Sequence, residues 1–324
     1  MDIAPVATRA DLEDFHAVVR AAMAHDYVGL PADPIEEWLP LLEQPESAGE
    51  RFELHVGRDA GVPVGTVCLR TPTLDNLEVV SCDLMVHPDH RLRGHGRALA
   101  DLVLSETRRL GRTRVFTAVA SWPDRPTPAL RLLEQHGFKP VIEDVRRMLD
   151  LRTRPPGPRP EVPADYRVVQ WVDRAPDELV DGCAYLTGRM TVDAPMGEMD
   201  YEQEKWDAAR YREKEQGAVD RRRRRIVTVA VHGSGQVAGL TEVAVSDVDP
   251  VVGYQWDTIV DPDHRGHGLG LVLKAWNHAF LTEAAPAVRY VNTWNAASNT
   301  FMIRVNEELG FQPVDTWTEH QLDL

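Results

Sequence analysis

The sequence contains no apolar run of the roughly 18 residues that a membrane-spanning helix requires. Its N-terminal stretch, MDIAPVATRADLEDF, carries acidic side chains and no sustained apolar segment, so no secretory leader is indicated. The only cysteines, Cys68, Cys82 and Cys183, stand far apart, which indicates neither a zinc site nor a disulfide framework. We therefore expect a soluble, cytoplasmic protein with buried thiols and no metal.

An excess of basic charge is also missing. The 36 lysines and arginines stand against 51 acidic residues, and the resulting net charge of −15 repels nucleic-acid phosphates. One basic run, Arg221–Arg225, could bind phosphate or RNA if taken alone. It lies between the charge-rich, helical segment 204–216 and the strand-like segment 226–232, where we expect a solvated loop that neutralises nearby acids. We expect no nucleic-acid and no membrane partner.

What the chain does contain is an internal repeat. The segment VHPDHRLRGHGRAL, residues 86–99, returns as VDPDHRGHGLGLVL, residues 260–273. Arg91 and Arg265 are separated by 174 residues (265 − 91), and Gly137 and Gly310 by 173 (310 − 137). Such close spacing predicts the same fold twice.

The proline-rich segment 151–163 separates the copies, because prolines supply no backbone donor and favour extended linkers. We expect one domain over 1–150 and a second over 164–324. Each is predicted to begin with helices, followed by short strands, a helix, a strand, a second helix and a final strand pair. This order predicts the α/β (α+β) class, with two domains that each hold a mixed, mostly antiparallel sheet flanked by helices.

The pattern is clearest in the second copy. Strands are expected over 225–233, 236–245, 251–260 and 288–294, and helices after Gly268 and over 298–311. The loop RGHGLG, residues 265–270, therefore joins a strand to the start of a helix. Backbone N–H groups at a helix start form an anion site, and glycines let a phosphate approach the backbone closely. A pyrophosphate fits this loop. The Lys-Ser/Thr pair of a P-loop is absent, and the glycines do not follow the first strand of either copy, as those of a Rossmann motif would.

The pattern V-x-P-x-x-R-x-x-G-x-G, present as Val86–Gly96 and as Val260–Gly270, resembles the signature of the GNAT N-acetyltransferase superfamily. The ending Leu309-Gly310-Phe311 is similar to the last helix of that family, and the tandem layout resembles its double-domain actinobacterial members. The resemblance implies acetyl-CoA as co-substrate, with pyrophosphate on the loop amides. The implied cofactor-binding residues are Ile259, Val260, Arg265, Gly266, His267, Gly268, Leu269, Gly270, Asn295 and Asn299 in the second copy, and Val86, Arg91, Arg93, Gly94, His95, Gly96 and Arg97 in the first.

Two acids on neighbouring predicted strands, Glu242 and Asp257, are candidates for the general base. An acid inside an apolar strand is costly unless it is paired, so each is either functional or part of a buried ion pair. Asp257 matches Asp83 in the first copy, which suits a structural role. Glu242 matches Cys68, and a feature found in one copy alone suits catalysis better.

The oxyanion donor and the acid remain. For the oxyanion we expect the strand amides near Ile259. Where many family members place a tyrosine, this chain has Asn306, which can donate a hydrogen bond to sulfur but cannot release a proton. We therefore expect the departing thiolate to be stabilised rather than protonated by the protein.

The second copy is predicted to be catalytic, and the first to be degenerate with a loop that could hold acetyl-CoA as a structural ligand. The expected acceptor is a primary amine of a small molecule or a peptide N-terminus. We expect it to enter between the opening helices and the split strands of the second copy. Segment 188–206 lies there, and its aromatic, methionine and acidic side chains either line the entrance or pack the helical cover. The rival hypothesis is a catalytically silent acetyl-CoA-binding sensor or scaffold. A monomer is compatible with a fusion that is already a pseudo-dimer.

Overall fold

The computed structural model describes residues 1–122, 127–193 and 195–324. It divides into two compact units that do not follow the chain in a simple order. The first unit holds Met1–Asp144, Gly197–Tyr201 and Asp315–Leu324, and the second holds Val145–Met196 and Glu202–Val314. The last strand of the chain therefore belongs mainly to the first unit.

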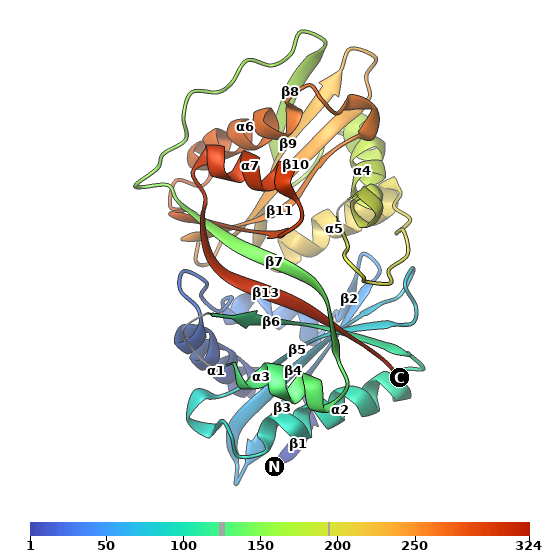
Figure 1. Ribbon diagram of the computed structural model, residues 1–324, viewed down its shortest axis with the longest axis vertical. Helices are drawn as coiled ribbons and strands as arrows, with labels where there is room; N and C mark the ends of the chain where they lie inside the picture. The colour runs from blue at the N-terminus through green and yellow to red at the C-terminus, as the bar shows by residue number, and fades with distance from the viewer. Residues whose placement is uncertain (123–126, 194) are drawn as a thin grey trace. The chain divides into compact units, whose positions relative to one another are not determined.

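The first unit is a mixed sheet with helices on both faces. Its strands are β1 (Asp2–Pro5), β2 (Glu46–Ser47), β3 (Glu50–Asp59), β4 (Val62–Pro72), β5 (Val79–Val86), β6 (Arg114–Ser121), the first part of β7 (Lys139–Asp150) and most of β13 (Gln312–Asp323). Its helices are α1 (Arg9–Asp26), α2 (His95–Arg109) and α3 (Pro128–Gln135), with 3₁₀ turns η1 (Ile35–Glu37), η2 (Leu39–Leu42) and η3 (Pro88–His90). The strand order β1-β3-β4-β5-β6-β13 ends with β13 beside β6, as Figure 1 shows.

Strand β4 explains why helices cover both faces. Its residues from Val64 to Leu69 are all buried, which a strand achieves only when both faces are covered. Leu69 packs with Leu99 and Val103 of α2, whereas Cys68 packs with Phe15 of α1. Helices α1 and α2 therefore lie on opposite faces of this sheet.

The second unit repeats this plan. Its strands are β8 (Tyr166–Val172), β9 (Arg223–His232), β10 (Val237–Ser246), β11 (Val252–Val260), β12 (Tyr290–Ala296) and the second part of β7, in the order β8-β9-β10-β11-β12-β7. Its helices are α4 (Val180–Asp193), α5 (Ala208–Asp220), α6 (Leu269–Ala284) and α7 (Thr300–Leu309), with 3₁₀ turns η4 (Asp177–Leu179) and η5 (Pro262–His264). All ten residues of β10 are buried. Cys183 of α4 lies in one core cluster with Leu240, and Leu273 of α6 lies in another with Ala238.

The predicted class of a mixed, mostly antiparallel sheet flanked by helices is confirmed in both units. Three details differ from the expected order. A short strand, β1 or β8, precedes the first helix of each copy, and the final element is one long strand, β13, rather than a pair. The expected loop at Arg221–Arg225 is also wrong in part, because Arg223–Arg225 begin β9.

In the part of the chain that the structure describes, no helix is long and apolar enough to cross a membrane. The same residues contain no group of three or more His, Cys, Asp or Glu side chains arranged to hold a metal ion.

Candidate functional site

The loop before α6 has the shape that the glycine pattern predicts. Gly266 and Gly268 have φ angles of 84° and 72°, in the left-handed region that favours glycine, and Gly268 is the N-cap of α6. No side chain caps this helix, and a Cβ built at Gly266 or Gly268 would meet no atom within 4 Å. The first N–H groups of α6 are therefore unblocked for an anion.

The arginine of the motif holds the loop to the end of the strand before it. Arg265 donates from Nε to the carbonyl of Val260 at 3.2 Å, and its guanidinium lies 3.4 Å from Asp193. In the first unit Arg91 donates in the same way to Val86 at 3.1 Å, and it forms two hydrogen bonds with Asp26 at 2.6 and 2.9 Å. Both arginines thus have intramolecular roles in fixing the predicted anion loops.

The loop of the first unit has the same shape, although one of its left-handed positions is a leucine. Gly94, the N-cap of α2, has a φ of 88°, and Leu92 has a φ of 60°. Among the other predicted residues, His95 is buried with its Nε2 3.7 Å from a carboxylate oxygen of Asp59, and Arg97 donates to Gln135 at 3.4 Å. Leu92 is 88% exposed and stands where the second unit has Gly266, so the first loop carries a side chain at a position where the second has none.

A wedge opens between β11 and β12 beside the α6 loop. The two strands run parallel and pair over three residues, Val252–Tyr254 opposite Tyr290–Asn292. Within the described residues this ladder stops there, while β11 continues to Val260 and β12 to Ala296. The unpaired edges of the two strands therefore face a gap in the hydrogen-bonding ladder.

The ladder with β10 decides which amides of β11 face this wedge. Asp261 donates to the carbonyl of Ala238 at 2.9 Å. Because hydrogen-bonded pairs alternate with non-bonded pairs along an antiparallel ladder, the next hydrogen-bonded pair is Ile259 with Leu240. The N–H groups of Thr258 and Val260 then point away from β10. Of the strand amides near Ile259 that the sequence indicates, those of Thr258 and Val260 face the wedge, whereas the amide of Ile259 faces Leu240.

Strand β11 carries a bulge that β5 lacks. Opposite β10, Thr241 pairs with Thr258 and Val243 pairs with Gln255, so Glu242 stands opposite two residues, Trp256 and Asp257. The corresponding β4–β5 ladder runs from Gly65–Val86 to Arg70–Ser81 without a shift. A bulge bends its strand and re-aims side chains and amides, so the two units differ at the inner end of the wedge.

Glu242 lies at the centre of a buried ion-pair network. Its carboxylate accepts hydrogen bonds from Lys214 at 2.7 Å and from Arg225, whose Nε is at 3.1 Å. Glu242 is fully buried and Arg225 is 1% exposed. Burial alone would raise the pKa of Glu242, but the charges of Arg225 and Lys214 lower it to about 2. This geometry favours the ion-pair alternative, because a buried carboxylate held by two cations is a weak base.

Asp257 has a different environment in the bulge. Its carboxylate accepts a hydrogen bond from Lys214 at 3.0 Å, and its side chain is 25% exposed. Opposing effects act on Lys214, since burial lowers its pKa and the charges of Asp257 and Glu242 raise it, with a net increase. Of the two predicted base candidates, Asp257 is therefore the one that solvent can reach.

The asparagines of the second unit form hydrogen bonds within the protein. Asn306 donates from Nδ2 to Asn295 Oδ1 at 2.6 Å and accepts from Lys274 Nζ at 2.6 Å. Asn299 caps α7 by accepting from the N–H of Met302 at 3.1 Å. Among the loop residues, His267 packs against Tyr166, with ring centres 5.6 Å apart. The structure thus joins Asn295 and Asn306, and it gives Asn299 a capping role.

Segment 188–206 is divided between the two units. Met190 and Trp206 pack against the core of the second unit, whereas Gly197–Tyr201 belongs to the first unit, where the ring of Tyr201 contacts Phe116. Packing therefore accounts for part of this segment.

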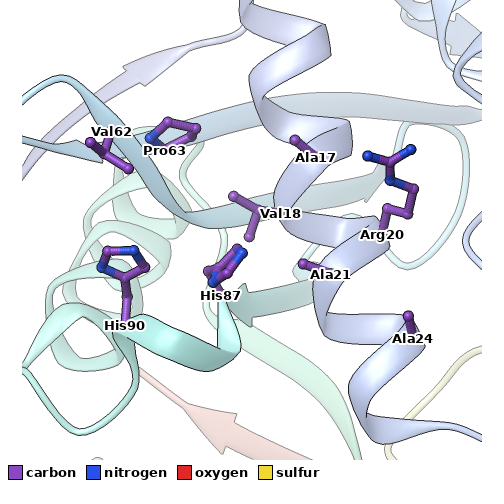
Figure 2. A pocket seen from close by; sticks show the side chains of 9 residues that line it. All are labelled: Ala17, Val18, Arg20, Ala21, Ala24, Val62, Pro63, His87 and His90. Carbon is purple, nitrogen blue, oxygen red and sulfur yellow. The ribbon is translucent and has the colours of Figure 1, made fainter.

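A pocket of about 560 Å³ lies in the first unit. Figure 2 shows small side chains of α1 and Arg20 on one side, and Val62 and Pro63 at the start of β4 with His87 and His90 on the other. Its lining contains none of the glycine-loop residues that the sequence singled out.

Sequence analysis missed two partners of the candidate residues. The basic run predicts a solvated Arg225, whereas this side chain is the buried counter-ion of Glu242. Lys274 was not singled out, although a lone lysine in the apolar helix LGLVLKAWNHAF is itself a signal of a special position.

The comparisons with known proteins agree with this geometry. The Acetyltransferase (GNAT) family matches residues 17–138 and 194–311, so both copies match. Mycothiol acetyltransferase of Saccharomonospora viridis is 29% identical over 245 residues, covering 72% of this chain and 71% of the relative. Mycothiol acetyltransferase of Salinispora arenicola is 27% identical over 324 residues, covering 96% of this chain and 92% of the relative.

Solved structures have the same architecture. A tandem GNAT protein from the clavulanic acid biosynthesis pathway, solved without AcCoA, has a TM-score of 0.83 at 28% identity and covers 99% of this chain and 98% of its own. A GCN5-related N-acetyltransferase from Sphaerobacter thermophilus shares the fold with a TM-score of 0.66 at 21% identity, over 99% and 95% of the two chains. The chain therefore belongs to the GNAT acetyltransferase family, as a tandem N-acetyltransferase distantly similar to mycothiol acetyltransferase.

Proposed function

We propose that this enzyme transfers the acetyl group of acetyl-CoA to a primary amine of a small molecule or a peptide N-terminus, and that the reaction takes place in the second unit. The observation that carries the proposal is the β11–β12 wedge directly beside the unblocked start of α6. A pyrophosphate can bind the α6 amides while a slender acyl-carrying arm lies along unpaired strand edges. The family match supports acetyl-CoA as the donor.

Within this proposal, the amides of Thr258 and Val260 are the hydrogen-bond donors on the wedge side of β11. One of them is suited to stabilise the oxyanion that develops on the thioester carbonyl, because a fixed backbone N–H needs no reorganisation during the reaction. The amine nitrogen attacks the carbonyl carbon, the C–S bond breaks, and the electron pair leaves with sulfur.

Asp257 is our candidate for the group that attracts the acceptor ammonium and takes its proton, directly or through water. Its partial exposure and its position in the bulge support this role. Glu242 is better suited to hold Lys214 and Arg225 in place. The first unit lacks the bulge and places Leu92 in its loop, which supports assigning the chemistry to the second.

The proposal is tested by thermal unfolding with acetyl-CoA and by mass spectrometry of a panel of primary amines and peptides incubated with protein and acetyl-CoA. A ligand that binds the native state raises the melting temperature. We expect such a rise together with a mass increase of one acetyl group on at least one amine. A protein that binds acetyl-CoA and acetylates none of the panel above the rate without protein would contradict an amine acceptor of these classes.

A further inference from the structure

Lys274 is a buried cation whose partner is an amide. The residue is 1% exposed, its Nζ donates to Asn306 Oδ1 at 2.6 Å, and it lies 5.1 Å from the centre of the Phe311 ring. Across the described residues it forms no ion pair with a carboxylate. Burial lowers the pKa of Lys274 to about 7. A cation in such a place is costly, so its position calls for an explanation.

The lysine determines how the amide of Asn306 is oriented. An ammonium group only donates, so Asn306 must present its oxygen to Lys274 and its Nδ2 to the other side. There Nδ2 donates one hydrogen to Asn295 Oδ1 at 2.6 Å. Asn295 lies three residues beyond Asn292, the last residue of β12 that pairs with β11, and thus on the wedge. Asn306 is fully buried, whereas Asn295 is partly exposed, so Asn295 is the amide that can present its Nδ2 to the wedge while its Oδ1 is held by Asn306.

We infer that Lys274 is a positioning residue for acetyl transfer: through Asn306 it holds Asn295 as a hydrogen-bond donor toward the thioester sulfur, and it places a positive charge behind that amide. The inference rests on the proposed function, because it needs the acyl-CoA arm in the wedge. When the C–S bond breaks, the electron pair moves to sulfur and the amine proton leaves to Asp257 or water. The CoA thiolate is then stabilised by the Asn295 N–H and the Lys274 charge, and no protein acid has to protonate it.

Lys274 is the group in this cluster whose charge changes near neutral pH. On α6 itself, burial and the charge of Lys274 lower the pKa of His278 to about 3, so this imidazole is neutral. From α7 the contact is the amide of Asn306, and from the connection between α7 and β13 it is the ring of Phe311. From β11, Gln255 reaches His278 at 3.3 Å.

The experiment compares wild-type protein, Lys274→Met, Asn306→Leu and the double variant, each first checked for CoA binding by calorimetry. We expect Lys274→Met to fold, because an apolar side chain of similar length replaces a buried charge. It should lower kcat about 10²-fold while the KM for acetyl-CoA changes less than about threefold. The double variant should be no slower than the slower single variant, because the two residues act as one unit.

A second readout does not depend on turnover. The ultraviolet absorbance of the thiolate, followed in the complex with CoA as pH rises, gives the thiol pKa of bound CoA. We expect that pKa to be higher by about one unit or more in Lys274→Met, because the thiolate and the Lys274 ammonium stabilise each other as a coupled pair and the variant lacks this cation. If Lys274→Met binds CoA with an unchanged thiol pKa and keeps the wild-type kcat, the inference is wrong while the proposed function stands. Wild-type protein that binds no CoA would overturn the proposed function and the inference with it.

Discussion

Leu92 and Gly266 occupy equivalent positions in the two glycine loops, and both have left-handed backbones, with φ angles of 60° and 84°. A leucine in this conformation is strained by about 1 kcal/mol, whereas glycine adopts it freely. The first loop therefore has the same shape as the second, although leucine disfavours the left-handed conformation.

Leu92→Gly should stabilise the protein by about 0.5–1 kcal/mol, because the strain is released and the 88% exposed side chain contributes little packing. The reverse change, Gly266→Leu, should destabilise it by a similar amount. Urea unfolding of both variants measures the two free energies. A stability loss for Leu92→Gly would show that the leucine side chain has a packing role that offsets the strain.

Glu242→Gln should lower the free energy of unfolding by about 3–5 kcal/mol, since it leaves Arg225 and Lys214 buried without their shared carboxylate. Asp257→Asn should cost less stability and lower kcat by about 10²–10⁴, the range for a lost general base. Denaturant unfolding and initial rates measured on both variants separate the two roles. A stable, slow Glu242→Gln beside a fully active Asp257→Asn would reverse this assignment.

The ion pairs of Glu242 also predict how acid affects stability. Its folded pKa of about 2 lies below its ordinary value of 4.5, so the folded state releases the proton more readily than the unfolded chain. The stabilisation is present above pH 4.5 and is lost as pH falls toward 2. Glu242→Gln should therefore show a weaker loss of stability over that range than wild type. Parallel acid titrations that lose stability equally would contradict the network.

Glu319 of β13 predicts a pH effect of opposite sign in the first unit. Burial, with Asp144 and Asp83 nearby and only partly offset by Arg70, raises the pKa of Glu319 to about 7. The folded state then binds more protons than the unfolded chain between pH 4.5 and 7, so stability falls as pH rises through this range. Glu319→Gln should flatten that fall, as followed by the melting temperature in a series of buffers. A fall of undiminished size in the variant would place its origin elsewhere.

Local features of the sequence predicted much of this molecule. The repeated glycine loops, the order of strands and helices after Gly268 and the C-terminal cap at Gly310 depend on short-range patterns, and the structure confirms them. Arg225 was misjudged because a basic run looks solvated until the neighbouring strand is known to place Glu242 beside it.

The wedge and the bulge could not be predicted in the same way. The wedge depends on where the β11–β12 ladder stops, and the bulge on one extra residue in β11 relative to β10, neither of which has a local sequence signal. Pairing between distant segments decides both features.

The central claim is that acetyl transfer takes place in the second unit, with acetyl-CoA on the loop before α6. The most direct measurement is the initial rate of CoA thiol release with acetyl-CoA and an accepted amine, for wild type, Gly268→Asp and Gly94→Asp. A carboxylate at either glycine occupies the matching anion site and repels pyrophosphate. We predict that Gly268→Asp lowers kcat/KM by about 10² or more and that Gly94→Asp stays within about threefold of wild type. Full activity in Gly268→Asp with loss of activity in a folded Gly94→Asp would contradict the account.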